Sequence, residues 1–239
     1  MLEQCQFSQL RYQLKRSARR RTLALQIKQG QLAVLAPVQL DKLVIDQFIT
    51  TKQAWIRRHL QAQIAQEMPP DYLALGQLPL LDEQLVLQVV DDQVSAVSRD
   101  GNRLWVQLSA RVTAQGRPAK IQQLLRQWYQ QQAQEWFASR VRYWEPLLQV
   151  RVRQVEIKHW RQKWGCCSAA GVVSFNWRLM LAPAWVADYV VVHELAHRRH
   201  MDHSPAFWQL LHRHFPQAAA AKQWFRQHQH RLTLEHRSV

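Results

Sequence analysis

The chain has 239 residues, 47% of them hydrophobic, and a net charge of +15. It is long enough to bury a full core, and its composition excludes a disordered protein. The longest apolar run, residues 179–187, contains Pro183 and falls far short of the roughly 20 residues that a membrane-spanning helix needs. Three cysteines and an N-terminus without an apolar signal segment predict a cytoplasmic protein with no membrane partner.

The positive charge is uneven along the chain. Residues 1–115 hold 14 basic and 10 acidic side chains (+4), whereas residues 116–239 hold 18 and 7 (+11). A surface of this sign attracts polyanions, so nucleic acid, nucleotides or acidic protein segments are expected partners. The basic run at 15–21, KRSARRR, either contacts phosphates or protects an edge strand by its charge.

Hydrophobic periodicity predicts a β-rich first part. Alternating apolar residues at 23–27 and 32–36, on either side of Gln29-Gly30, indicate a hairpin. Apolar residues at helical spacing over 40–64 predict one helix. Small antiparallel strands are expected at the short apolar runs of 72–75, 78–81, 85–90 and 103–108. We therefore predict a domain over 1–115 that is antiparallel β-rich and contains one helix.

The second part is mainly helical, and the turn-rich segment 113–118 predicts the domain boundary. In the strand expected over 172–181, the polar side chains Asn176 and Arg178 alternate with apolar ones. Pro183 opens a helix that should run to about residue 200. The remaining predicted elements are helices at 118–141, 205–214 and 216–231 and a strand near 151–158. The prediction is an α+β chain whose second domain, 116–239, is helical with a small sheet.

An HExxH motif, His193-Glu194-Leu195-Ala196-His197, lies in the helix predicted after Pro183. Two residues four apart lie about 40° apart on a helix, so both imidazoles can reach one metal ion. Glu194 projects about 100° from His193, too far round for a comfortable ligand. It is placed to act as general base on a water held at the metal.

His203 is the predicted third ligand. On a continued helix it would point away from the metal, but Ser204-Pro205 is an N-cap followed by proline at the first helical position. His203 then lies on a turn that can bring its ring back. His200 is the rival for this place, and otherwise a group on the substrate side. Three histidines predict an open catalytic site with one Zn²⁺ per chain and no other cofactor.

Residues 161–216, from RQKWGCC to HELAHRRHMDHSPAFW and HFP, resemble the YgjP-like (SprT-like) zinc metallopeptidase domain family. The basic N-terminal RSARRRTLALQI resembles it too. The resemblance implies a zincin-like α+β fold, a mononuclear zinc, the ligands His193, His197 and His203, and Glu194 as the catalytic residue. A strand ahead of the metal helix pairs with substrate in zincins. Asn176 and Arg178 of that strand are therefore substrate-binding candidates, and His200 is a third, from the substrate side of the metal.

These observations favour a zinc-dependent metallohydrolase, most consistently a metallopeptidase acting on a protein or peptide. One alternative is a metal-dependent nucleoside triphosphate (UTP-type) pyrophosphohydrolase. Against it, the sequence has no Gly-rich phosphate loop and no carboxylate cluster for Mg²⁺. A second alternative is a nucleic-acid-associated protein with structural zinc, which leaves Glu194 without a role. The candidates for the oxyanion-stabilising donor are His200, Arg178 and Lys163.

Overall fold

The computed structural model describes residues 2–7, 10–28, 31–64 and 69–235. The chain forms two compact units, residues 1–67 and 68–239, each with its own hydrophobic core. Both combine helices with small sheets, which confirms the α+β prediction. The division between the units lies well before the predicted boundary at 115/116.

The first unit contains a four-stranded sheet in the order β1-β2-β4-β3. Its strands are β1 (Leu2–Phe7), β2 (Leu10–Ser17), β3 (Ala24–Lys28) and β4 (Gln31–Pro37). The predicted hairpin is confirmed as the antiparallel pair β3–β4, but β2 and β4 are parallel, so the sheet is mixed. β2 lies inside the sheet, so the expectation that KRSARRR protects an edge strand is wrong.

Two helices follow where one was predicted. They are α1 (Lys42–Thr51) and α2 (Gln53–Ile64). Lys52 separates them, and its backbone N–H caps the end of α1. Ile45, Ile49 and Ile56 are fully buried in one cluster with Tyr12 and Leu14 of β2. The helical spacing of the apolar residues is therefore confirmed, but that spacing could not show that the helix is interrupted at Lys52.

The second unit begins with α3 (Tyr72–Leu75), where Asp71 caps a helical turn in place of the predicted strand. A second mixed sheet follows, in the order β5-β6-β8-β7. Its strands are β5 (Gln77–Leu80), β6 (Glu83–Asp92), β7 (Ala96–Asp100) and β8 (Arg103–Ser109). A short 3₁₀ helix, η1 (Ala114–Gly116), leads into α4 (Arg117–Leu148).

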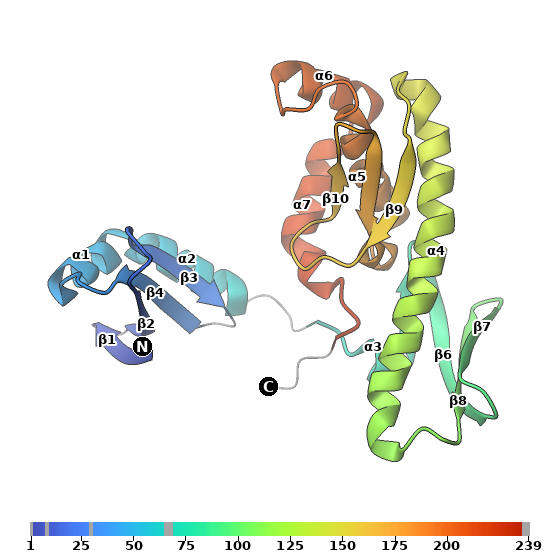
Figure 1. Ribbon diagram of the computed structural model, residues 1–239, viewed down its shortest axis with the longest axis horizontal. Helices are drawn as coiled ribbons and strands as arrows, with labels where there is room; N and C mark the ends of the chain where they lie inside the picture. The colour runs from blue at the N-terminus through green and yellow to red at the C-terminus, as the bar shows by residue number, and fades with distance from the viewer. Residues whose placement is uncertain (1, 8–9, 29–30, 65–68, 236–239) are drawn as a thin grey trace. The chain divides into compact units, whose positions relative to one another are not determined.

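Helix α4 explains why this sheet belongs to the second unit. Leu104, Val106 and Leu108 of β8 share one buried cluster with Leu125 and Phe137 of α4. The sheet β5–β8 lies along the first half of α4, and β9 lies along its second half (Figure 1). Turn residues at 113–118 mark a change of element within one core, and not a boundary between units.

The third sheet has the order β10-β11-β9. It consists of β9 (Gln154–Lys158), β10 (Gly165–Cys167) and β11 (Val172–Asn176). The strand predicted over 172–181 ends at Asn176, whose side chain accepts a hydrogen bond from the Arg178 N–H and caps the 3₁₀ helix η2 (Trp177–Leu181). Apolar side chains on all sides of η2 are buried, so the two-faced strand pattern stops at residue 176.

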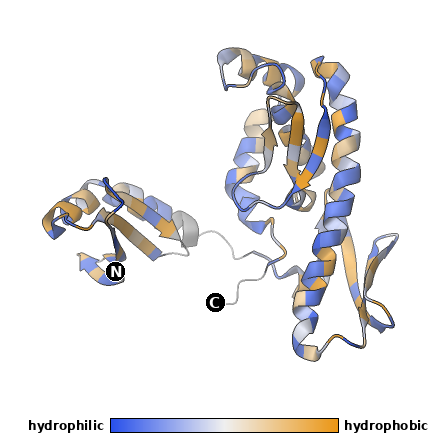
Figure 2. Cartoon of the chain, in the orientation of Figure 1, coloured by the Kyte–Doolittle hydropathy of each residue, from blue (hydrophilic) through white to orange (hydrophobic). Residues whose placement is uncertain are grey.

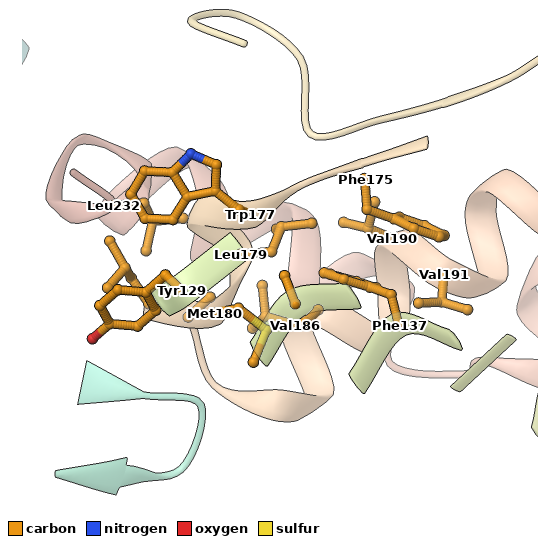
Figure 3. Packing of buried hydrophobic residues seen from close by; sticks show 14 of the residues in the cluster. Tyr129, Phe137, Phe175, Trp177, Leu179, Met180, Val186, Val190, Val191 and Leu232 are labelled. Atoms are coloured by element: carbon orange, nitrogen blue, oxygen red, sulfur yellow. The ribbon is translucent and has the colours of Figure 1, made fainter. Parts of the chain in front are cut away.

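Three helices complete the unit: α5 (Ala184–Ala196), α6 (Pro205–His214) and α7 (Ala218–His228), followed by the short η3 (Gln229–Arg231). Helix α5 is almost wholly apolar and is buried against α4 and β11. Figure 3 shows this packing, in which Phe137 and Phe175 stack with ring centroids 4.4 Å apart near Val190. Helix α5, which carries most of the HExxH motif, is thus fixed in the core of the second unit.

The long helix α4 is polar along much of its length, as its predominantly hydrophilic colouring in Figure 2 shows. Within the described ranges, no helix combines the length and the apolar character needed to cross a membrane.

All three cysteines are free thiols: Cys5 is buried, Cys166 is exposed and Cys167 is half-buried.

Candidate metal centre

The three histidines of the predicted site come together in the structure. His193 lies on α5, His197 caps the end of that helix, and His203 lies just before α6. One ring nitrogen from each of the three lies within 4.8 Å of the other two, a spacing that could hold a metal ion. The Nε2 atoms of His193 and His203 are 3.2 Å apart. Two ligands of one tetrahedral ion would be about 3.3 Å apart for bonds of roughly 2.0–2.1 Å, so the spacing of this pair is that of two ligands of one metal ion.

The chain turns between His197 and His203 as the sequence predicts. Helix α5 ends at Ala196, four residues before the predicted end. Ser204 then caps α6 by accepting a hydrogen bond from the Phe207 N–H, and Pro205 is the first residue of α6. This break carries His203 back toward His193, which a continuous helix would not do.

Aromatic packing orients the three imidazoles. The Phe207 ring is fully buried, and its centroid lies 5.0, 4.6 and 4.8 Å from those of His193, His197 and His203. Trp208 stacks on His203 from the side, with centroids 5.5 Å apart. Two residues of the first turn of α6 therefore fix the positions of three histidine rings that come earlier in the chain.

A hydrogen bond fixes the ring of His197. Its Nδ1–H donates to the backbone oxygen of His200 at 3.0 Å, which leaves Nε2 as the ring nitrogen that could bind a metal. The side chain of His200 is absent from the metal-binding cluster found among the described residues. His200, the rival third ligand, thus contributes its carbonyl group to the arrangement.

Burial favours the neutral form of His193 and His197, the form that binds metal. The pKa of His193 falls to about 3, mainly because the ring is desolvated and further because His197, His203 and Lys222 are nearby. Burial also lowers the pKa of His197. A neutral imidazole has a ring nitrogen whose lone pair can bind a cation.

Glu194 lies beside the histidines and is 6% exposed. Burial raises the pKa of its carboxyl group to about 8, while the positive charge of Lys163 acts in the opposite direction. Gly165 of β10 packs directly against it: a Cβ atom there would lie 2.5 Å from Oε1 of Glu194. Only glycine leaves room for the carboxylate beside this strand.

A pocket of about 370 Å³ opens beside His193 and Glu194. Its walls come from the loop before β10, from α5 and from α7. It is lined by Lys163, Trp164, Gly165, Tyr189, Val190, His193, Glu194, Lys222, Phe225, Arg226 and Gln229. Glu194 and His193 therefore face a space in which a substrate can bind.

The substrate-binding candidates Asn176, at the end of β11, and Arg178, in η2, have other contacts. Asn176 is fully buried, and its Nδ2 donates to the backbone oxygens of Trp160 and Lys163, both at 2.8 Å. Arg178 donates to the Trp160 oxygen at 2.7 Å, and its guanidinium lies 5.0 Å from the Trp164 ring centroid. Since β11 pairs with a strand on each side, it has no free edge for a substrate backbone.

Several residues of the pocket were missed by reasoning from the sequence. Lys222, Phe225 and Arg226 of α7 are three and four residues apart, so they lie on one helix face. A face with two cations beside an aromatic ring was visible in the sequence. Nothing local connected it to the HExxH motif, because only the packing of α7 against α5 brings the two together.

Comparison with known proteins gives one extensive match. The family model described as YgjP-like, metallopeptidase domain, matches residues 21–228. A crystal structure of the metallopeptidase zymogen of Pyrococcus abyssi abylysin matches at 19% identity and a TM-score of 0.34, over 36% of this chain and 89% of that chain. A search of curated proteins finds no significant match. The family match covers most of both compact units, including all three histidines.

Proposed function

The chain belongs to the YgjP-like metallopeptidase domain family, and on that premise we propose that it is a zinc-dependent metallopeptidase. One observation carries the proposal: three histidine nitrogens converge beside a buried glutamate on the wall of a pocket. In this proposal His193, His197 and His203 hold the metal, and Glu194 is the general base.

The donor set favours zinc. Three neutral imidazoles suit a tetrahedral Zn²⁺, and three protein ligands leave one position open for chemistry. When bound there, the zinc ion would supply Lewis acidity to water and to the scissile carbonyl group. Its positive charge would also favour the ionised form of the nearby Glu194 carboxyl group.

Glu194 would carry the proton through the reaction. Its ionised carboxylate accepts a proton from the attacking water and delivers that proton to the leaving amine. The close contact with Gly165 fixes the carboxylate at the edge of β10. Of the three predicted oxyanion donors, Lys163 lines the pocket with Glu194, so we assign it to stabilise negative charge on the carbonyl oxygen.

The strand β10 offers the edge that β11 lacks. It pairs with β11 on one side and ends the sheet order on the other. An extended peptide can add to such an edge through backbone hydrogen bonds. Here that would place a peptide bond beside Glu194. Asn176 and Arg178 then act as positioning residues, because they hold the loop that carries Lys163.

Parallel turnover assays test this function. Zinc-loaded protein is incubated with an unfolded polypeptide, a DNA-bound protein and nucleoside triphosphates, with Glu194→Gln as the control. We expect peptide fragments from the wild type and roughly 10²–10⁴-fold less from Glu194→Gln. Pyrophosphate release without peptide cleavage would overturn the proposal in favour of a pyrophosphohydrolase.

A further inference from the structure

The pocket beside His193 and Glu194 is strongly cationic. Lys163, Lys222 and Arg226 line it, and Glu194 is its one acidic residue. Among the ion pairs that the described residues form within 4 Å, none involves any of these three cations. No described carboxylate therefore lies within 4 Å of the Lys222 or Arg226 cation, and the pocket can supply these two charges to an anionic ligand.

Helix α7 holds Lys222 close to the candidate metal-binding cluster. Ala218 and Ala221 are fully buried and anchor α7, so Lys222 and Phe225 continue the same inward stripe. The Nζ of Lys222 lies 3.6 Å from the Trp208 ring centroid, and Trp208 stacks on His203. One aromatic ring thus separates the ammonium group from a candidate metal ligand.

Aromatic rings give the pocket an apolar wall. Phe225 stacks on Trp164 with centroids 5.5 Å apart and lies 6.5 Å from Tyr189. Such a wall suits the aliphatic part of a side chain whose charged end reaches Lys222 and Arg226. Phosphate sites usually add backbone N–H groups from a Gly-rich loop or a helix N-terminus. The residues from α5 and α7 that line this pocket lie beyond the first turn of each helix.

Like charges are crowded here. Burial and the nearby Arg226 guanidinium both lower the pKa of Lys222. An anion between the two groups relieves that repulsion, and a guanidinium can bind a carboxylate through two parallel hydrogen bonds.

We propose that this pocket binds a carboxylate group of the peptide substrate through Lys222 and Arg226, so that the enzyme prefers bonds next to a carboxylate. The carboxylate is either the side chain of an acidic residue or the free C-terminus. The inference rests on the proposed peptidase function and adds a substrate class to it.

Matched peptides test the preference. One set is amidated at the C-terminus and carries Glu, Gln or Lys at a single internal position, and a second set has a free C-terminus and only neutral side chains. We expect the zinc-loaded wild type to cleave the Glu peptide, the free C-terminal peptide or both about 10-fold faster than the neutral amidated peptide. Whichever set shows the preference identifies the source of the carboxylate. Equal cleavage of all peptides would overturn the subsite and leave the peptidase function intact.

Substitutions then assign the preference to residues. Lys222→Gln and Arg226→Gln should each reduce the ratio of acidic to neutral cleavage by about 10-fold, and Arg226→Glu should shift it toward the Lys peptide. Arg142→Gln removes an equal charge from an exposed position on α4 and should leave the ratio unchanged. A preference that survives both α7 substitutions would refute the assignment.

A binding assay separates this inference from the proposed function. Fluorescence anisotropy follows a labelled Glu peptide and its Gln counterpart on zinc-loaded Glu194→Gln, where turnover is suppressed. Tighter binding of the Glu peptide, lost with Lys222→Gln, supports the subsite even if no peptide is ever cleaved. Equal binding of the two peptides overturns it, as does displacement of the Glu peptide by nucleoside triphosphates at lower concentration than by the same peptide unlabelled.

Discussion

The two compact units differ sharply in charge density. Residues 1–67 hold 11 basic and 4 acidic side chains, a net charge of +7, whereas residues 68–239 hold 21 and 13, a net charge of +8 in a much longer segment. The candidate metal centre and its pocket lie entirely in the second unit. The smaller unit is therefore the denser in positive charge, and the larger one contains the groups for chemistry.

This comparison changes the meaning of the charge pattern. Division at 115/116 assigned +11 to the part that contains the HExxH motif and only +4 to the rest. Residues 68–115 hold 3 basic and 6 acidic side chains and belong to the second unit. Counting them with residues 1–67 had lowered the net charge given to the first part of the chain. We infer that attraction of polyanions and hydrolysis are separable properties of this protein, and substitutions in either unit can test that.

Loss of the third ligand should have the largest effect. His203→Ala should weaken zinc binding by more than the roughly 10–100-fold that loss of an outer-shell partner costs, and abolish peptide cleavage. Zinc stabilises the unit that binds it by about 4 kcal/mol when its free concentration is roughly 1,000 times the dissociation constant. Calorimetry should show that zinc raises the temperature of one unfolding transition in the wild type and of none in the variant.

His200→Ala is the matched control, because the structure uses the carbonyl group of this residue and not its ring at the metal centre. Elemental analysis should find about one zinc per chain in this variant. Zinc loss from His200→Ala together with retention in His203→Ala would reverse the ligand assignment.

Glu194→Gln comes next in size. The amide cannot accept the proton from water, so hydrolysis should fall by roughly 10²–10⁴-fold while zinc remains bound. The unfolding transition of the second unit should stay at least as high as in the wild type, since the substitution removes a buried ionisable group. A variant that loses its zinc but keeps its activity per bound zinc would show that Glu194 is a ligand.

Gly165→Ala should have an intermediate effect. A methyl group would lie 2.5 Å from Oε1 of Glu194, so the carboxylate must move, and hydrolysis should fall by roughly 10–100-fold with zinc retained. Gly116→Ala is a matched control far from the metal motif in the sequence, where the nearest atom is Thr113 Oγ1 at 3.2 Å. Equal activity of both variants would mean that the position of Glu194 does not depend on this contact.

Local patterns predicted which three histidines come together, since their geometry depends on one helix and one cap. The spacing of His193 and His197 and the Ser204-Pro205 signal lie within a dozen residues. Lys222 and Arg226 could not be assigned in the same way, because they reach the pocket only through packing between α5 and α7. The role of Asn176 was also hidden, since its hydrogen bonds go to a loop thirteen to sixteen residues earlier in the chain.

The first unit provides the prediction with the smallest effect on catalysis. Arg19 and Arg21 are exposed and Arg20 is half-buried, in the segment that follows β2. If they contact phosphates, replacing all three with Gln should weaken non-specific binding to DNA or RNA. Each lost contact should reduce the slope of log K against log salt concentration by about one. Peptide cleavage by the zinc-loaded variant should remain unchanged, because the catalytic groups lie in the other unit.

Arg16 supplies the control within the same basic run. Its guanidinium donates hydrogen bonds to the backbone oxygens of Pro37, Val38 and Leu40 at 3.3, 3.0 and 2.7 Å, so its donors already serve the fold. Arg16→Gln should therefore lower the unfolding temperature of the first unit, while the salt dependence of nucleic-acid binding changes little. Anisotropy titrations from 50 to 200 mM salt distinguish the two effects. If the wild type binds no nucleic acid even at low salt, the charge of the first unit serves a different anionic partner, and acidic protein segments become the next to test.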